Sequence, residues 1–196
     1  MRLGLFGGVF NPPHLGHVVC AQEARIQLEL DEVWLIPTGE PPHKSLDNDP
    51  GGKLRFEMCR RAIEGQPGLA VSDIEVNRPG ISYSVDTLTV LNEQMHKEEL
   101  FMILGADQAS TMATWRNPAA IGRIVEVAVV DRGDVDRPTI AQAVVEATGK
   151  QPLFVEMPRI DVSSSFVRES AAAGRTVRHL VAAGVAETIE LQGLYA

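Results

Sequence analysis

Six short runs rich in apolar residues divide the chain, and most of them are continuous rather than alternating. The continuous runs cover residues 2–6, 32–37, 100–105, 125–131 and 153–157, whereas residues 69–76 alternate between apolar and polar side chains. Continuous apolar runs are typical of strands covered on both faces, while alternation favours a more exposed or edge strand. The pattern therefore predicts five buried strands and one edge strand.

Helical periodicity falls between these runs. It covers residues 14–30, 53–65, 84–96 and 136–148, and it returns at 163–173 and 177–191. Alternating strands and helices predict an α/β fold, a Rossmann-like, doubly wound and mostly parallel sheet with helices on both faces. At 196 residues, we expect a single domain over 1–196, with an α/β core over 1–162 and a C-terminal helical segment over 163–196 packed on it.

Three of the predicted strands end in glycine or polar residues. Their sequences are LGLFGG, LIPTG and MILGAD. In doubly wound sheets, ligands bind beyond the carboxyl ends of the strands, at the point where the strand order reverses. We therefore expect one crevice to collect all three strand ends.

The stretch GGVFNPPHLGH (7–17), which follows the first predicted strand, has the features of a phosphate site. Gly7 and Gly8 let the backbone turn sharply and approach a ligand closely, and the two prolines suit the entry to a helix. If a helix begins near His14, then His14 and His17 lie on one face of its first turn. The start of a helix attracts phosphate through its unpaired N–H groups. The alternative is a polar helix cap with one surface histidine.

A second stretch, VSSSFVR (162–168), follows the last apolar run and opens another predicted helix. Ordinary helix capping explains Ser163 or Ser164. Capping does not explain Arg168, which lies about one turn from Ser165. Together these two residues form a second anion site at a helix start, with Arg168 as a fixed cation.

These two stretches carry a resemblance to a known family. GGVFNPPHLGH resembles the signature of the nucleotidyltransferase superfamily whose members have an H-x-G-H or T-x-G-H motif. Within that superfamily, the chain resembles the bacterial nicotinate-nucleotide adenylyltransferases almost from end to end. Further matching segments, in order, are IPTGEPPHK (36–44), ISYSVDTL (81–88), ILGADQ (103–108) with TW (114–115), and VSSSFVR (162–168).

The resemblance implies a reaction of ATP with nicotinate mononucleotide that yields nicotinate adenine dinucleotide and pyrophosphate, in NAD biosynthesis. The mononucleotide phosphate attacks the α-phosphorus directly, so catalysis depends on positioning and charge stabilisation. The implied catalytic residues are His14, His17 and Arg168, the last as a cation for the β- and γ-phosphates. The implied ATP-binding residues are Gly7, Gly8, Val9, Phe10, His17, Gly105, Asp107, Ser165 and Arg168.

The middle of the chain is expected to bind the nicotinate nucleotide. Trp115 is the candidate for stacking on the pyridine ring, with Tyr83 and Thr87 as further contributors, and Lys44 of the PPHK loop is implied to reach substrate phosphate. The alternatives are a core aromatic for Trp115, a half-exposed strand residue for Tyr83 and a solvated charge for Lys44. Asp107, after a strand end, suits ribose hydroxyls, although it could also cap the helix that follows.

Composition narrows the class of protein. The net charge of −8 disfavours a nucleic-acid partner, and no segment has the length of a membrane span or the pattern of a signal peptide. Cys20 and Cys59 match no metal or redox spacing and suit buried positions in a reducing compartment. We therefore expect a cytoplasmic protein, with no nucleic acid and no membrane as a partner. The sequence leaves homo-oligomerisation open.

The resemblance also implies Mg²⁺, bound mainly through the ATP phosphates, because no dedicated protein cage for a metal is visible. Two groups of alternatives stay open at this point. The chain could be an adenylyltransferase for nicotinamide mononucleotide or phosphopantetheine, although the phosphopantetheine enzymes usually show T-x-G-H where this chain has His14. It could also be a nucleotide-binding regulator without catalysis.

Overall fold

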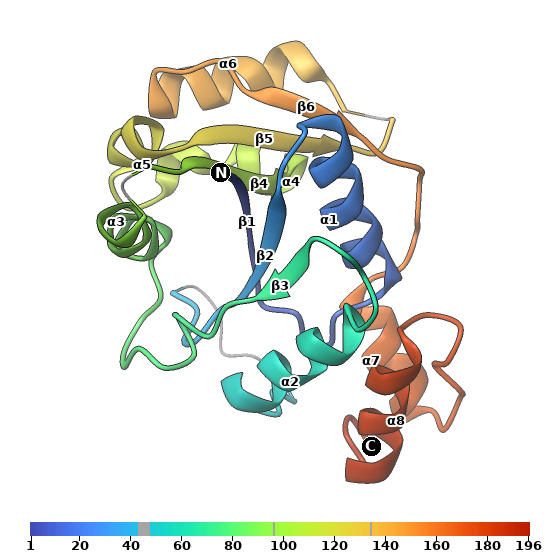
Figure 1. Ribbon diagram of the computed structural model, residues 1–196. Helices are drawn as coiled ribbons and strands as arrows, with labels where there is room; N and C mark the ends of the chain where they lie inside the picture. Colours follow the sequence, from blue (N-terminus) through green and yellow to red (C-terminus); the bar gives the residue numbers. More distant parts are fainter. Residues whose placement is uncertain (43–47, 96, 134) are drawn as a thin grey trace.

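The computed structural model describes residues 1–42, 48–95, 97–133 and 135–196. Within these ranges, a six-stranded sheet with the order β3-β2-β1-β4-β5-β6 forms the centre, and all its strands are parallel (Figure 1). This order is that of a doubly wound Rossmann-like sheet, as predicted. The strands are β1 (Arg2–Gly8), β2 (Glu32–Pro37), β3 (Leu69–Val71), β4 (Glu99–Gly105), β5 (Glu126–Asp131) and β6 (Leu153–Glu156).

The edge strand β3 is shorter than the alternating pattern predicted. It pairs with β2 through Leu69–Val71 and then leaves the sheet, although the prediction continued to residue 76. The residues that follow form a turn, in which the N–H of Asn77 bonds to the carbonyl of Asp73 and that of Arg78 to the carbonyl of Glu75. A turn with one side buried also alternates in polarity, so the pattern alone could not separate it from a strand.

Helices cover both faces of the sheet, because successive strand residues point to opposite sides. On one face, Leu5 and Met102 belong to the apolar cluster that packs under α3 (Ser84–Gln94), α5 (Pro118–Ile124) and α6 (Arg137–Thr148). On the other face, Phe6 and Ile103 belong to the cluster that packs under α1 (Leu15–Gln27) and α2 (Gly52–Ala62). Both faces of β1 and β4 are therefore buried.

The short elements between β4 and β5 were not predicted. These are α4 (Ala106–Ser110), a 3₁₀ turn (Met112–Thr114) and α5. They are too short to show a helical period, and the polar TWRNP sequence interrupts them. Their anchors are Met112 and Ile121, which are fully buried against the sheet.

A third apolar cluster joins α2 to α7 (Ser164–Ala172) and α8 (Ala183–Gln192). The helix predicted from residue 177 begins only at Ala183. Leu180 lies in the turn before it, and its carbonyl accepts a hydrogen bond of 3.1 Å from the N–H of Leu15, the first residue of α1. That bond satisfies a free N–H at the start of α1. The turn over residues 177–181 instead buries Val177, Leu180 and Val181 in the third cluster.

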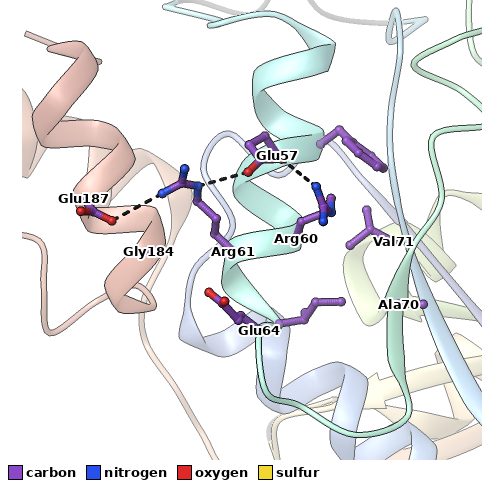
Figure 2. Close-up of a pocket in the computed structure, with 10 residues that line it drawn as sticks. Glu57, Arg60, Arg61, Glu64, Ala70, Val71, Gly184 and Glu187 are labelled. Carbon is purple, nitrogen blue, oxygen red and sulfur yellow. Dashed lines mark hydrogen bonds and ion pairs between the residues drawn. The ribbon is translucent and has the colours of Figure 1, made fainter.

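The contact between α2 and α8 is close, and it borders a cavity of about 610 Å³ next to β3 (Figure 2). A side chain at Gly184 would meet Arg61, so glycine allows α8 to approach α2. Arg61 also donates to Glu57 of α2 and Glu187 of α8, at 3.2 and 3.5 Å. Exposed pairs of this kind contribute little, so the apolar cluster holds the helices together. The single-domain organisation stays a prediction, and this packing supports it.

The two cysteines are free and buried, as expected, and burial raises the pKa of the Cys20 thiol to about 12. In the part of the chain that the structure describes, no helix combines the length and the apolar character needed to cross a lipid bilayer.

Arg55 of α2 is fully buried, and it ties together the loops that follow β1 and β2. Its guanidinium donates to the carbonyl oxygens of Val9, Thr38 and Gly39 at 2.9, 2.7 and 3.1 Å. It also donates to the carboxylate of Asp49 at 2.8 Å. A buried cation is tolerated only when its N–H groups are paired in this way. Arg55 therefore determines where the two loops lie.

We predict that Arg55→Lys lowers the free energy of unfolding by about 3 kcal/mol, because an ammonium cannot reproduce the planar fork of donors and leaves carbonyls unpaired. Urea unfolding measures this loss. Arg60→Lys is the matched control in the same helix, since Arg60 is exposed and pairs with Glu57 on the helix surface. Equal effects of the two substitutions would contradict the role assigned to Arg55.

Candidate functional site

A cavity of about 960 Å³ opens at the carboxyl ends of β1 and β4, where the strand order reverses. Its lining includes Gly7 and Gly8 from β1, Thr38 after β2 and Gly105 at the end of β4. The expectation of one crevice shared by three strand ends is therefore confirmed. This is the position at which doubly wound sheets bind their ligands.

The loop after β1 has a specific shape that depends on its glycines. Phe10 adopts a left-handed backbone conformation, with φ of 51°, and its ring packs edge-on against Phe6 and His17 at centroid distances of 5.5 and 5.0 Å. A side chain at Gly8 would meet the ring of Phe10 at 3.0 Å. A Cβ at Gly7 would have no atom within 4 Å, so this position leaves open space beside the backbone. Gly8 thus makes room for Phe10, and Gly7 faces the cavity.

His14 and His17 form a stacked pair at the start of α1. Their ring centroids are 3.7 Å apart, and the N–H of His14 donates to Nδ1 of His17 at 3.0 Å. Since Nδ1 of His17 accepts, Nε2 of the neutral ring carries the proton and is a donor. A side chain at Gly16 would meet the ring of His14 at 3.0 Å, which explains the glycine between the two histidines. His17 lines the cavity, whereas His14 is buried behind it.

Both imidazoles are neutral near pH 7. Burial lowers the pKa of His14 to about 4, and the charge of Arg132 contributes in the same direction. Burial also lowers the pKa of His17 well below its ordinary value, assisted by His14 and Arg132. Arg132 lines the cavity, and the sequence did not single it out. The signal available for it was its position directly after β5, the next strand beyond β4.

The start of α7 packs against the loop that leads to His14. Ser163 is the N-cap, and its hydroxyl accepts from the N–H of Phe166 at 3.1 Å. Ser164 instead donates to the carbonyl of Pro12 at 2.8 Å. Capping therefore accounts for Ser163, while Ser164 joins α7 to the first loop.

Arg168 lies beside the same loop. Its guanidinium donates to the carbonyl of Asn11 at 2.8 Å and to the hydroxyl of Ser165 at 3.2 Å. Residues 162–168 and 7–17, far apart in sequence, thus lie together. Neither Ser165 nor Arg168 is among the residues that line the cavity, so both border the loop rather than the enclosed space.

Trp115 and Tyr83 line the cavity along with residues of the β1 loop. Tyr83 precedes α3, and the guanidinium of Arg116 lies 4.7 Å from the centroid of its ring. Arg116 also pairs with Asp86 at 3.4 Å. Two aromatic side chains therefore line the same cavity as His17, and the guanidinium of Arg116 packs against one of them. Lys44 lies outside the described residues.

Thr87 is placed differently from Trp115 and Tyr83. It is buried and does not line the cavity; its hydroxyl donates to Glu75 at 2.7 Å and accepts from Arg78 at 2.9 Å. Glu75 does line the cavity, and the sequence did not identify it. Burial raises the pKa of its carboxyl group, against the opposing effects of Thr87 and Arg78. Thr87 thus orients the carboxyl group of Glu75 at the cavity wall through a hydrogen bond.

Asp107 lies in the first turn of α4 and lines the cavity, where Gln108 follows it. A side chain at Gly105 would meet the carboxylate of Asp107 at 2.7 Å, so glycine keeps space open for that group. Among the described residues, no three His, Cys, Asp or Glu side chains gather in a way that could hold a metal ion. A cation in this cavity would therefore depend on its ligand for most of its contacts.

We predict that the free energy of unfolding falls as the pH drops from about 6.5 towards 4. The unfolded chain binds a proton on His14 near pH 6.5 and the folded chain only near 4, so stability is present above the unfolded pKa and is lost below it. The contribution of His14 is up to about 3 kcal/mol, the value of the difference between its two pKa values.

Urea unfolding at a series of pH values measures this dependence. His14→Asn should reduce this dependence by the share of His14 and leave the share of His17, whose pKa burial also lowers. His179→Asn, at an exposed histidine, is the matched control. A His14→Asn variant with the full pH dependence would show that His14 is not buried in its neutral form.

Comparison with known proteins supplies independent information. Residues 5–170 match the family model described as cytidylyltransferase-like. A probable nicotinate-nucleotide adenylyltransferase from Salinibacter ruber is 38% identical, and the match covers 100% of this chain and 98% of the relative. A protein of the same name from Shouchella clausii is 36% identical over 99% of this chain and 96% of its own length.

Solved structures show the same fold. The Plasmodium falciparum nicotinic acid mononucleotide adenylyltransferase complexed with NaAD superposes with a TM-score of 0.81, covering 99% of this chain and 97% of that chain at 16% identity. The same enzyme complexed with APC gives a TM-score of 0.78 at 15% identity, over 99% of this chain and 96% of that chain.

Proposed function

The chain belongs to the nicotinate-nucleotide adenylyltransferase family, and from that premise we propose that it joins ATP and nicotinate mononucleotide. The products are nicotinate adenine dinucleotide and pyrophosphate, which makes the reaction a step of NAD biosynthesis. One observation carries the assignment: a single cavity brings His17 and the glycine loop of β1 together with Trp115 and Tyr83. Phosphate-binding and ring-binding groups thus share one space.

The triphosphate of ATP binds at the end of the cavity formed by the β1 loop and the start of α1. The backbone of the loop that leaves β1 and the positive end of the helix together attract phosphate. Arg168 and Ser165, beside that loop, are the cation and the hydroxyl for the β- and γ-phosphates. Arg132, directly after β5 at the same edge of the sheet, adds a further cation.

The chemical step needs no covalent intermediate with the protein. An oxygen of the mononucleotide phosphate bonds to the α-phosphorus, the bond to the bridging oxygen breaks, and its electron pair leaves with pyrophosphate. The attacking phosphate is already an anion, so no general base is required. Positioning of the reactants and stabilisation of charge therefore accelerate the reaction, as in other phosphoryl transfers.

His14 and His17 act as neutral donors in this scheme. The proton on Nε2 of His17 is available for a phosphate oxygen, because Nδ1 is engaged by the N–H of His14. Since the hydrogen bond and the stacked ring hold His17 in place before ATP binds, little reorganisation is needed as charge develops. Burial thus keeps the imidazoles oriented, and it also leaves them without a positive charge near pH 7.

The nicotinate nucleotide occupies the other half of the cavity. Trp115 stacks on the pyridine ring, and Tyr83 contributes beside it. Thr87 acts here through Glu75, which it hydrogen-bonds, and Lys44 is assigned to substrate phosphate. Asp107 and Gly105 receive the ribose and adenine side of ATP at the end of β4.

Enzymes of this kind use a divalent metal with ATP, and we propose Mg²⁺ for this chain. The described residues offer no cage of protein ligands, which suits an ion held by phosphate oxygens and water. When bound, it offsets the negative charge of the phosphates.

We expect pyrophosphate release from ATP with nicotinate mononucleotide, and a much lower kcat/KM with nicotinamide mononucleotide or phosphopantetheine. His17→Ala should lower kcat by about a hundredfold, as for other lost transition-state donors, without loss of folded protein. A coupled pyrophosphate assay measures the substrate preference and the kcat of the variant. Preference for phosphopantetheine, or no release above an enzyme-free control, would overturn the proposed function, the latter in favour of a nucleotide-binding regulator.

Trp115→Ala should raise the KM for nicotinate mononucleotide about fivefold and leave the KM for ATP within twofold, since stacking on one ring contributes roughly 1 kcal/mol. Trp115→Phe is the matched variant, because it keeps an aromatic face and should recover most of the affinity. Steady-state kinetics with each substrate varied in turn measure the two constants. An equal rise in both would place Trp115 outside the nicotinate subsite.

A further inference from the structure

The segment after α8 turns back into the molecule. Gly193 ends the helix in a left-handed conformation with φ of 59°, and the N–H of Leu194 bonds to the carbonyl of Ile189 at 3.0 Å. This closure is a common helix end, which glycine favours because it has no Cβ. It directs Tyr195 into the apolar cluster of α2, α7 and α8, where its side chain is buried.

The hydroxyl of Tyr195 reaches the loop that precedes His14. It donates to Oδ1 of Asn11 at 2.7 Å, and the two residues are 6% and 4% exposed. Burial raises the pKa of the Tyr195 hydroxyl, so it keeps its proton and remains the donor. A buried hydroxyl and a buried amide oxygen both need a partner, and here each satisfies the other.

Asn11 is held from two sides. Its side-chain oxygen accepts from Tyr195, and its backbone carbonyl accepts from Arg168 at 2.8 Å. The neighbouring carbonyl of Pro12 accepts from Ser164. All three hydrogen bonds come from the region after residue 162, so that region fixes the position of the loop between β1 and α1.

External support of this kind has a physical reason. Phe10 directly precedes Asn11, and a left-handed backbone at a residue other than glycine costs of order 1 kcal/mol unless surrounding contacts maintain it. The loop also connects the glycine pair to His14. A shift of Asn11 would therefore move the phosphate-binding N–H groups and release Arg168 at the same time.

We propose that Tyr195 is a positioning residue for the triphosphate site: by holding Asn11, it keeps the β1 loop and Arg168 in one arrangement before ATP binds. The inference rests on the proposed function. It also explains why an asparagine suits the position that accepts from Tyr195. A carboxylate there would compete with the phosphates for Arg168, whereas the amide oxygen accepts the Tyr195 proton without adding charge.

The test removes only the hydroxyl. Tyr195→Phe should lower kcat/KM for ATP about tenfold, the size of one lost hydrogen bond that orients a site, and leave the KM for nicotinate mononucleotide within twofold. Thr188→Val is the matched control, because Thr188 is similarly buried in α8 and its hydroxyl donates to the carbonyl of Gly184 within the same helix. It should change the thermal midpoint as Tyr195→Phe does, with unchanged kinetics for ATP.

A double-mutant cycle with Asn11→Ala locates the effect. If Tyr195 acts through Asn11, Tyr195→Phe should cause no further loss of kcat/KM for ATP when Asn11 is already replaced by alanine. Additive losses, or a Tyr195→Phe variant that is less stable but has wild-type kinetics for ATP, would overturn the inference.

Calorimetric titration with ATP keeps this test separate from the reaction itself. If the wild-type chain fails to form nicotinate adenine dinucleotide, the proposed function fails. Tyr195→Phe should still weaken ATP binding about tenfold relative to Thr188→Val if the positioning role is correct. Equal affinity of the two variants for ATP would refute that role, whatever the reaction.

Discussion

The guanidinium of Arg55 is the interaction on which the cavity depends. It lies out of contact with water, and its donors are shared among carbonyls that follow β1 and β2 and the carboxylate of Asp49. A buried charge is expensive to leave unpaired, so each of these groups must stay within hydrogen-bond distance. Two loops that belong to different strands are thereby held as one wall of the nucleotide site.

The other end of the first loop is held by a different set of contacts. Val9 is bonded to α2 through Arg55, while Asn11 and Pro12 are bonded to α7 and to the segment after α8. The stretch between Gly8 and His14 therefore has partners on both sides, and its left-handed Phe10 is maintained by them. Preorganised N–H groups and a fixed His17 are what a phosphate-transfer site requires, because they stabilise developing charge without rearranging.

Charge is distributed locally in a chain that is acidic as a whole. The net charge is −8, yet Arg132 lines the cavity and Arg168 borders the loop. His14 and His17 are neutral because burial, together with the charge of Arg132, lowers their pKa values. In the proposed function, attraction for phosphate comes from two arginines and a helix end, while the imidazoles contribute oriented hydrogen-bond donors.

The sequence by itself determined the strands, most of the helices and the parallel sheet. It also singled out the two stretches, 7–17 and 162–168, that the structure brings together and to which we assign phosphate binding. Strand and helix periods, glycine pairs and capping residues are local patterns, and local patterns can be recognised in one dimension. Tertiary structure alone decided the roles of Arg55, Glu75, Arg132 and Tyr195 and the late start of α8. Each of these depends on a partner elsewhere in the sequence. Asn11 and Tyr195, for example, are 184 positions apart. A buried polar group is defined by the partner that satisfies it, and only folding brings that partner within reach.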